Sequence, residues 1–345
     1  MTTMTSLNEA EELVVFGKGV GESILLRLKD EQWIVIDSFI SPNSGKPVAV
    51  EYLETRGIDT ENIIGIVCTH WDDDHIHGIS DIISVHRRPL TVVLPIALKE
   101  RRVKEYVYFN SDHDINTSSE FIKVLELRKQ QRCAFCWAQS DRNLFGNVIC
   151  DDQIVFKALS PNDEQYEEFL KYIVLPSEKC VKRGYSSYEN SISVAVYVKT
   201  CTESFLLGGD LENSAIGGWE AVCNNYHEST KSHIFKVPHH GSESAYYEHI
   251  WTTLVDQPIA IITRFNRSHL PKDDMLQKIK AHACKVFVVG PTPKRDKLLM
   301  KSAVKYGGAI NSVSILDYDY GYVRLYREQS NTNWCIETQG CVQEL

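Results

Sequence analysis

Short apolar runs alternate with longer amphipathic stretches along most of the chain. The short runs predict strands, at residues 12–37, 63–68, 90–94, 148–159, 191–207, 233–237, 259–263 and 285–289. The longer stretches predict helices, at residues 47–57, 78–86, 97–129, 211–223, 244–254 and 271–282. Residues 312–336 alternate like a further meander that could close one sheet edge. This order of elements predicts an α/β protein.

One of the predicted strands, Ile64–Cys68, runs directly into a dense group of histidines and aspartates. The group consists of His70, Asp72, Asp73, Asp74, His75 and His77. Carboxylates this close together repel and raise each other's pKa unless a cation lies among them. A solvated acidic loop is the alternative interpretation. The buried-looking strand before the group and the apolar helix start behind it favour a metal site.

Two later strands also end in potential metal ligands. Phe205–Asp210 ends in Gly-Gly-Asp, and Phe235–Ser242 carries His239 and His240 directly after an apolar run. The ends of neighbouring strands in one sheet can converge, and in α/β sheets ligands bind at the carboxyl ends of strands. Three such clusters in one chain therefore predict a shared metal centre.

These motifs resemble the metallo-β-lactamase superfamily, and within it the soluble hydrolase domain of the ComEC family of bacterial DNA-uptake proteins. That family also carries Asp, here Asp72, where most relatives have a second histidine. Its opening hairpin, its Asn-Ser segment and its Asn-x-x-x-His-Pro-type loop resemble residues 16–23 with 33–37, 189–191 and 266–271. The resemblance covers roughly residues 12–290 and implies a four-layer αββα sandwich of two mixed β-sheets.

The resemblance also implies a ligand set for two divalent metal ions bridged by one aspartate and a water. The first ion would take His70 and Asp72, with Asn190 where most relatives have a third histidine. The second would take Asp74, His75 and one histidine of the later pair, and Asp210 would bridge. We expect His239 to be that histidine because it follows the strand most directly, with His240 as the alternative.

The residue types around the expected first ion bear on metal identity and chemistry. With Asp72 and Asn190 in place of two imidazoles the site is oxygen-rich, so manganese or magnesium is plausible beside zinc. Two divalent ions can activate a water for phosphodiester hydrolysis. Asp74 could orient that water, and His240 or His269 could donate a proton to the leaving group. His269 could equally cap the following helix.

Asp37, at the end of a predicted strand, could orient a ligand histidine through a hydrogen bond or cap the next turn. We expect residues 1–345 to form one domain with a helical insertion at about 97–130 and a polar loop at about 175–189. The basic and aromatic residues of the insertion could grip a nucleic acid, but an amphipathic helix with a solvated face is slightly favoured. The loop carries lysine, arginine and tyrosine side chains that could contact substrate.

Composition narrows the function classes. The net charge of −9 argues against a broad nucleic-acid surface, although a local basic groove is compatible with it. No long apolar window and no secretion signal are found, and the ten cysteines are scattered. We therefore expect a cytoplasmic protein without a membrane partner.

Three functions remain open at this point. The first is a metal-dependent phosphodiesterase, as a nuclease acting on DNA, which the likeness to the uptake proteins implies. The second is a hydrolase of a small nucleotide signal or another small ester. The third is an effector whose latent hydrolase site is controlled by a regulatory protein partner.

Overall fold

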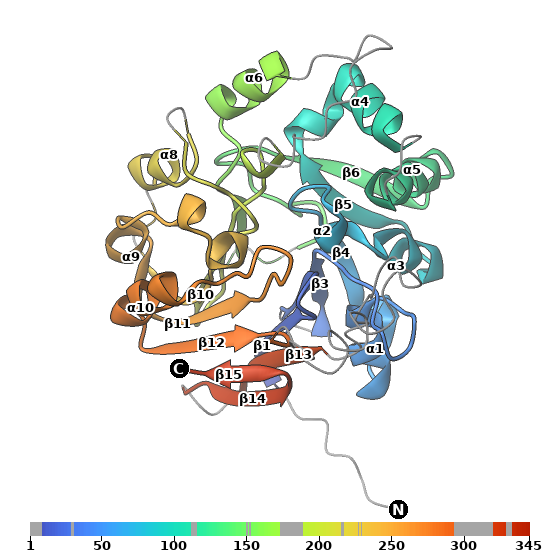
Figure 1. Ribbon diagram of the computed structural model, residues 1–345. Helices are drawn as coiled ribbons and strands as arrows, with labels where there is room; N and C mark the ends of the chain where they lie inside the picture. The colour runs from blue at the N-terminus through green and yellow to red at the C-terminus, as the bar shows by residue number, and fades with distance from the viewer. Residues whose placement is uncertain are drawn as a thin grey trace, which may run out of the picture.

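Two β-sheets pack face to face, and helices cover the outer face of each sheet (Figure 1). The computed structural model describes residues 9–28, 31–111, 116–149, 151, 153–172, 189–214, 217–226, 228, 230–292, 320–328 and 333–345. Both sheets mix parallel and antiparallel pairs. The four-layer αββα sandwich of two mixed sheets expected from the sequence is thereby confirmed.

The first sheet has the strand order β14-β13-β1-β2-β3-β4-β5-β6. Its members are β1 (Glu9–Gly17), β2 (Glu22–Arg27), β3 (Trp33–Ile36), β4 (Ile63–Val67), β5 (Leu90–Pro95), β6 (Cys133–Ala138), β13 (Gly321–Glu328) and β14 (Cys335–Gly340). The β1–β2 hairpin is antiparallel as predicted, whereas β3 to β6 run parallel. The parallel strands end together, at the edge where β4 leads into the histidine and aspartate group.

The second sheet has the order β15-β12-β11-β10-β9-β8-β7. Its members are β7 (Val155–Ala158), β8 (Val196–Lys199), β9 (Ser204–Leu207), β10 (Ser232–Lys236), β11 (Val255–Thr263), β12 (Lys285–Val289) and β15 (Val342–Glu344). Strands β9 to β12 are parallel, with Leu207, Lys236 and Ile261 in register. Consecutive β14 and β15 join different sheets, so the end of the chain links the two layers.

The helices lie mainly in the connections after parallel strands. They are α1 (Val48–Thr55), η2 (Thr60–Asn62), α2 (Asp73–Ile76), α3 (Ile79–Val85), η3 (Ile96–Lys99), α4 (Arg101–Ser111), α5 (Asn116–Lys129), α6 (Asp163–Tyr172), α8 (Trp219–Asn224), η4 (Pro238–Gly241), η5 (Glu243–Ala245), α9 (Ile250–Thr253) and α10 (Asp273–His282). Helices α4 and α5 occupy the stretch expected as an insertion. The loop expected at 175–189 lies outside the described residues except for Glu189.

One predicted helix is shorter than the pattern suggested. We expected a helix from Leu211 to about Cys223, but α8 begins only at Trp219, after Gly218 with φ +71°. The segment before it is held by other contacts: Trp219 Nε1 donates to the Leu211 carbonyl at 2.7 Å, and Asn213 N donates to the Ser244 carbonyl at 2.8 Å. The non-helical path leaves Glu212 free to contact the site described below.

Alternation along the strands divides the core into layers. In β1, Leu13 and Val15 face the second sheet, while Val14 and Phe16 pack with the helices outside. All four side chains are fully buried. Since each buried aliphatic or aromatic side chain contributes about 1.5–3 kcal/mol, this packing holds the strand ends rigidly at one edge of the sandwich.

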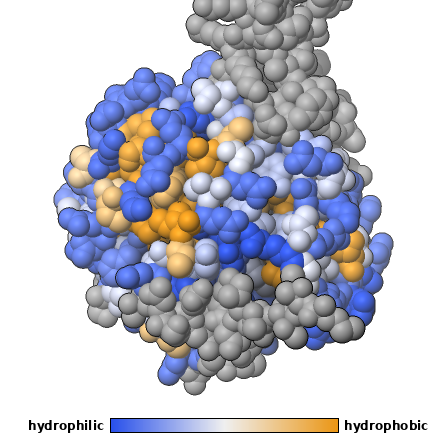
Figure 2. Space-filling model, turned by 90° about the horizontal axis from the view of Figure 1, so that it is seen from below, coloured by the Kyte–Doolittle hydropathy of each residue, from blue (hydrophilic) through white to orange (hydrophobic). Residues whose placement is uncertain are grey.

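The surface is largely polar where the structure describes it. Among the described residues, Val85 alone is both large, apolar and strongly exposed. Figure 2 shows one face, on which hydrophobic residues gather in an area surrounded by hydrophilic ones. No described helix combines the length and apolar character required to traverse a lipid bilayer.

Candidate metal centre

The carboxyl ends of strands from both sheets meet at one place. His70 and the α2 residues follow β4, Asp210 follows β9, and His239 and His240 follow β10. The sheets are joined there by a hydrogen bond from Val194 N to the Thr69 carbonyl at 2.9 Å. Residues more than a hundred positions apart in the sequence thus form one cluster.

Four residues form the deeper part of this cluster, called the inner group: Asp74, His75, Asp210 and His240. His75 Nε2 lies 3.4 Å from both Asp74 Oδ2 and Asp210 Oδ2. His240 Nε2 lies 3.3 Å from Asp74 Oδ2 and 3.6 Å from Asp210 Oδ2. Two imidazoles and two carboxylates therefore point at a common centre, and all but Asp74 are nearly inaccessible to solvent.

Four more residues form the outer group: His70, Asp72, Asn190 and His239. His70 Nε2 lies 3.7 Å from Asp72 Oδ2, and Asn190 Nδ2 lies 3.4 Å from His239 Nε2. The two groups adjoin, since the ring centroids of His70 and His75 are 4.2 Å apart. Asp72 and His239 keep 25% and 19% of their side-chain surface accessible, so this part opens towards solvent.

Each of the four histidines has its Nδ1 committed to an oxygen behind it. The partners of His70, His75, His239 and His240 are Thr69 Oγ1 at 3.0 Å, Asp37 Oδ2 at 2.8 Å, Glu212 Oε1 at 2.9 Å and Thr263 Oγ1 at 2.9 Å. Such a partner fixes ring orientation and tautomer in metal-binding histidines. Every Nε2 is consequently left for the centre of the cluster.

Several polar atoms in the cluster are buried without a hydrogen-bond partner in the described part of the chain: Nε2 of His70, His75 and His240, Oδ1 of Asp210 and Oδ1 of Asn190. Buried polar atoms are almost always satisfied in folded proteins, because leaving them bare is costly. Imidazole nitrogen, carboxylate and amide oxygen are all metal ligands. The donor set therefore fits divalent cations.

The pKa shifts within the inner group also indicate a site for a cation. Burial by itself would raise the pKa of Asp74 and Asp210, but the charge of neighbouring His75, together with His240, holds both well below their usual range. Burial would lower the pKa of His75, yet Asp210, Asp74 and Asp37 raise it well above its usual value. The two aspartates of the group thus stabilise positive charge at its centre.

In the outer group, burial has a larger effect on the pKa values than the neighbouring charges have. Burial, followed by the charge of His75, lowers the pKa of His70 to about 3, so its imidazole is neutral and able to bind a metal. Burial raises the pKa of Asp72 well above its usual range, and nearby Glu189 raises it further. Glu189 also accepts a hydrogen bond from Trp71. The carboxyl groups of Asp72 and Glu189 are therefore neighbours in the outer group.

A family model describes this architecture. The model of the metallo-β-lactamase superfamily matches residues 16–119, which run from the end of β1 to the start of α5 and include the first ligand motif. The match supports membership of the metallo-β-lactamase superfamily. Together with the buried cluster, it supports a metal-dependent hydrolase of the metallo-β-lactamase fold. The later motifs around Asn190, Asp210 and His240 lie outside the matched segment.

Solved structures similar to this chain include other proteins of that fold. YhfI of Bacillus subtilis, a metallo-β-lactamase fold protein, is 10% identical with a TM-score of 0.42, over 81% of this chain and 95% of YhfI. The short form of human tRNase Z is 13% identical with a TM-score of 0.38, over 84% of this chain and 87% of that one. The comparison with curated proteins found no match.

The geometry of the histidine pair differs from the sequence expectation. We expected His239 beside Asp74 and His75, but His240 lies there, and His239 lies with Asn190 in the outer group. The physical reason is the backbone: both residues are left-handed, with φ of +46° and +53°, so the chain turns sharply after Pro238. Strained backbone of this kind is typical of functional sites.

The residues expected to act in catalysis are placed differently from one another. Asp74 lies in the inner group, and His240 lies beside it with Nε2 directed at the carboxylates. His269 lies on the exposed turn between β11 and α10, and no described contact joins it to the cluster. It does not cap α10, whose N-cap is Lys272 without a side-chain hydrogen bond.

Glu22 and Glu212 contact the cluster but were missed by sequence reasoning. The Glu22 carboxylate lies 4.0 Å from His75 Nδ1 and 3.6 Å from His240 Nδ1, so it is behind the rings. It also accepts from Thr263 Oγ1 at 2.5 Å and binds Lys236 at 2.6 Å. Opposite charges inside two apolar strands, β2 and β10, were the signal that could have revealed Glu22.

Asp37 makes the hydrogen bond that the sequence suggested for it. Besides His75 Nδ1, it accepts from Thr69 N at 2.8 Å and Thr69 Oγ1 at 2.7 Å. Thr69 in turn contacts His70 Nδ1. One buried carboxylate thereby orients one histidine of each group.

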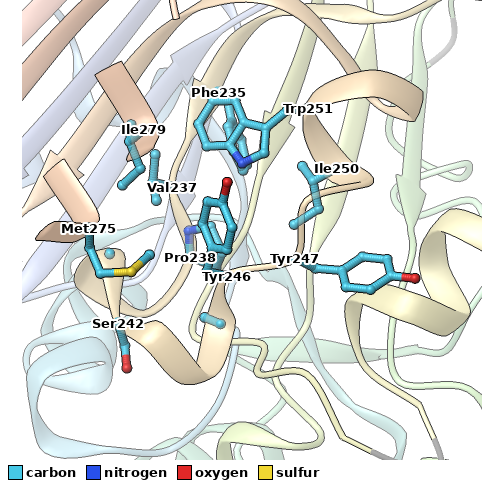
Figure 3. Close-up of a pocket in the computed structure, with 12 residues that line it drawn as sticks. Phe235, Val237, Pro238, Ser242, Tyr246, Tyr247, Ile250, Trp251, Met275 and Ile279 are labelled. Carbon is cyan, nitrogen blue, oxygen red and sulfur yellow. The ribbon is translucent and has the colours of Figure 1, made fainter. Parts of the chain in front are cut away.

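A small apolar pocket lies behind the segment that carries the histidine pair (Figure 3). Phe235, Tyr246 and Trp251 gather around it, and Pro238 and Ser242 belong to its wall. Its volume of ≈ 10 Å³ is about the minimum for one water molecule. The pocket supports the turn by packing and is too small for a substrate.

Proposed function

We propose that this protein is a metal-dependent phosphodiesterase, most specifically a nuclease, whose reaction centre holds two divalent metal ions. The observation that carries the proposal is the common orientation of four histidines, each with Nδ1 bound to an oxygen. Nε2 of His70, His75 and His240 faces Asp72, Asp74 or Asp210, and Nε2 of His239 lies beside Asn190. Bound cations would satisfy the buried nitrogen and oxygen atoms of the cluster that have no hydrogen-bond partner in the described part of the chain.

In this proposal the inner group holds one ion and the outer group holds the other. Asp210 would be the ligand that both ions share: its Oδ2 lies 3.4 Å from His75 Nε2 and 3.6 Å from His240 Nε2, and its Oδ1 has no hydrogen-bond partner among the described residues. This assignment gives His240 the ligand role expected for His239 and makes His239 a ligand of the outer ion, and it leaves the other ligands as inferred from the sequence. The oxygen-rich outer group makes manganese, zinc and magnesium the metals to test.

When bound, two divalent ions lower the pKa of water towards neutrality and stabilise the attacking and leaving oxygens of a phosphodiester. The protein's own residues supply orientation. Asp74, with an oxygen between His75 and His240, can accept a hydrogen bond from the attacking water. His240 has Nδ1 bound to Thr263 and would have Nε2 on the inner ion, so His269 is the residue we propose as proton donor to the leaving group.

The test is hydrolysis by purified protein supplied with manganese, magnesium or zinc. The substrates are bis-p-nitrophenyl phosphate and labelled single- and double-stranded DNA and RNA. We expect cleavage that Asp210→Ala abolishes and Asp256→Ala preserves, since Asp256 is an exposed aspartate near the amino end of β11. Metal-loaded protein that hydrolyses none of these substrates would contradict the proposal.

A second candidate is hydrolysis of a small nucleotide signal or another small phosphodiester. The net charge of −9 favours it, because a long nucleic acid needs many cationic phosphate contacts, whereas a small substrate needs only a local pocket. Cyclic dinucleotides in the same assay distinguish the two. Turnover of small diesters without polymer cleavage supports this candidate, and activity that appears only with an added protein indicates a regulatory partner.

A further inference from the structure

Two lysines lie beside the candidate metal centre, and they differ in whether a carboxylate of the described residues neutralises their charge. Lys236 is completely buried, and its Nζ lies 2.6 Å from the Glu22 carboxylate, so its charge is neutralised within the protein. Lys18 is partly buried, yet among the described residues no carboxylate lies within ion-pair distance of it. A desolvated cation is costly without an anion nearby, so Lys18 needs a different explanation from Lys236.

The fold holds Lys18 in one position. Its Nζ donates to the Ile40 carbonyl at 3.4 Å and lies 5.0 Å from the centre of the Phe39 ring. At Gly21, which has φ +128°, a side chain would meet Cε of Lys18 at 2.8 Å. The turn between β1 and β2 therefore needs this glycine to let the lysine side chain lie across it.

Lys18 is held next to the inner group. Its partner segment, Phe39 and Ile40, directly follows Ser38, whose N–H donates to the His75 carbonyl at 2.7 Å. Burial lowers the pKa of Lys18, and the charges of Asp73 and Asp74 oppose that shift. Through this backbone connection Lys18 lies beside the segment that carries the inner group, and its Nζ has no carboxylate of the described residues within ion-pair distance.

A second positively charged side chain, that of Arg267, belongs to the turn after β11 in the second sheet. Asn266 N donates to the Gly19 carbonyl at 2.6 Å, which joins the turn after β11 to the turn that carries Lys18. In the same turn, the ring of Phe265 stacks on His240 with centroids 5.0 Å apart. Arg267 follows these two residues, is exposed, and has no carboxylate partner among the described residues.

We propose that Lys18, with Arg267 at the rim, binds a negatively charged oxygen of the substrate beside the metal centre, which assigns the substrate to anionic esters such as phosphodiesters. The charged donor would hold a non-bridging oxygen while the ester bond lies over the cluster. The inference rests on the proposed function only in taking the inner and outer groups as the reaction centre. It distinguishes anionic phosphodiesters from neutral lactones and carboxylic esters.

Inorganic phosphate is the probe, measured by calorimetric titration into metal-loaded wild type and variants. Lys18→Met should bind phosphate about tenfold more weakly, the loss expected for a charge-assisted hydrogen bond. Lys18→Arg should retain most of the affinity, and Arg267→Met should lose about twofold because an exposed charge is screened. Lys285→Met is the matched control, since Lys285 is an exposed lysine at the amino end of β12.

Equal metal content in all variants shows that the cluster is intact. Phosphate affinity that is the same in Lys18→Met and wild type overturns the inference, as does an equal loss in Lys285→Met. Kinetics provide a second measurement: the preference for bis-p-nitrophenyl phosphate over neutral p-nitrophenyl butyrate, as kcat/KM, should fall about tenfold in Lys18→Met.

The two proposals can fail separately. If wild type binds phosphate through Lys18 but cleaves no diester, the proposed phosphodiesterase function is wrong and the anion site stands. If wild type cleaves diesters and Lys18→Met keeps the same preference for them, the function stands and the anion site is wrong.

Discussion

The inner and outer groups are built from the same kinds of side chain but are organised differently. The inner group encloses its centre with two histidines and two aspartates, and little solvent reaches it. In the outer group, Asp72 is engaged with Glu189 and His239 is partly exposed. The inner group is therefore the more enclosed and preorganised for a cation, whereas the outer group is open to solvent at Asp72 and His239.

Because the two groups differ in enclosure, we expect them to bind their metal ions with different affinities and exchange rates. A preorganised site needs little rearrangement, which would cost free energy, and therefore binds its ion tightly. A more open site with an amide and carboxylates exchanges its ion more readily and leaves room for substrate oxygens. We therefore expect the two halves of the cluster to respond unequally to the substitutions described next.

His240→Ala should have the largest effect, because it removes an inner ligand and leaves Asp74 and Asp210 to repel each other. We expect inner-site metal affinity to fall by more than about 100-fold, beyond the loss typical of an outer-shell substitution. Elemental analysis and phosphodiester turnover measure it. His269→Ala is the comparison: it should slow turnover while metal content stays unchanged, and a loss of metal there would show that our separation of the two histidines is wrong.

Asp72→Ala should remove one ion and spare the other. The outer group would lose its carboxylate while the inner ligands and their partners remain, so the bound metal should fall from about two ions per chain to about one. Titration of apo-protein with manganese measures the stoichiometry. Loss of both ions would mean that the two groups do not bind independently.

Thr263→Val should weaken the inner site about tenfold, the lower end of what an outer-shell partner contributes. The substitution keeps the shape of the side chain but removes the oxygen that lies between Glu22 and His240 Nδ1. Thr69→Val is its counterpart, because it removes the oxygen behind His70 in the outer group. If Thr263→Val weakens metal binding no more than Thr69→Val, the inner group is not the more dependent on orientation.

Asn190→His should have the smallest effect on activity but a clear effect on metal choice. It replaces an amide of the outer group with an imidazole, a ligand that suits zinc better than manganese. Competition between zinc and manganese, followed by activity with each metal, measures the change. An unaltered preference would show that Asn190 does not contact the outer ion.

Local sequence patterns reveal much of this centre because the ligands follow apolar strands. His70, Asp210 and the histidine pair each stand directly after such a strand, and the carboxyl ends of parallel strands share one edge. Asp37 is predicted to lie near the ligand histidines because it, too, directly follows a strand. Position after a strand predicts which residues approach the site, but not which atom each one presents.

The assignment within the histidine pair depends on backbone geometry that the residue order does not reveal. Left-handed conformations at both His239 and His240 direct the second histidine to the inner group and the first to Asn190. The contact that Glu212 makes could not be predicted from the residue order either. Its position after Asp210 suggests the start of a helix, but a non-helical path brings its carboxylate to His239.

The amino-acid sequence alone determined most strands, the strand ends and the types of ligand, because hydrophobic periodicity and charge density are local properties. The two-sheet architecture followed from the resemblance of its motifs to a known family. The tertiary structure decided which nitrogen faces which carboxylate, and that Glu22 and Lys236 neutralise each other beneath the cluster. It also decided that Lys18 lies at the edge of the cluster, where none of the carboxylates that the structure describes is within ion-pair distance. Such pairings join side chains from separate strands and turns, and only the folded packing brings them together.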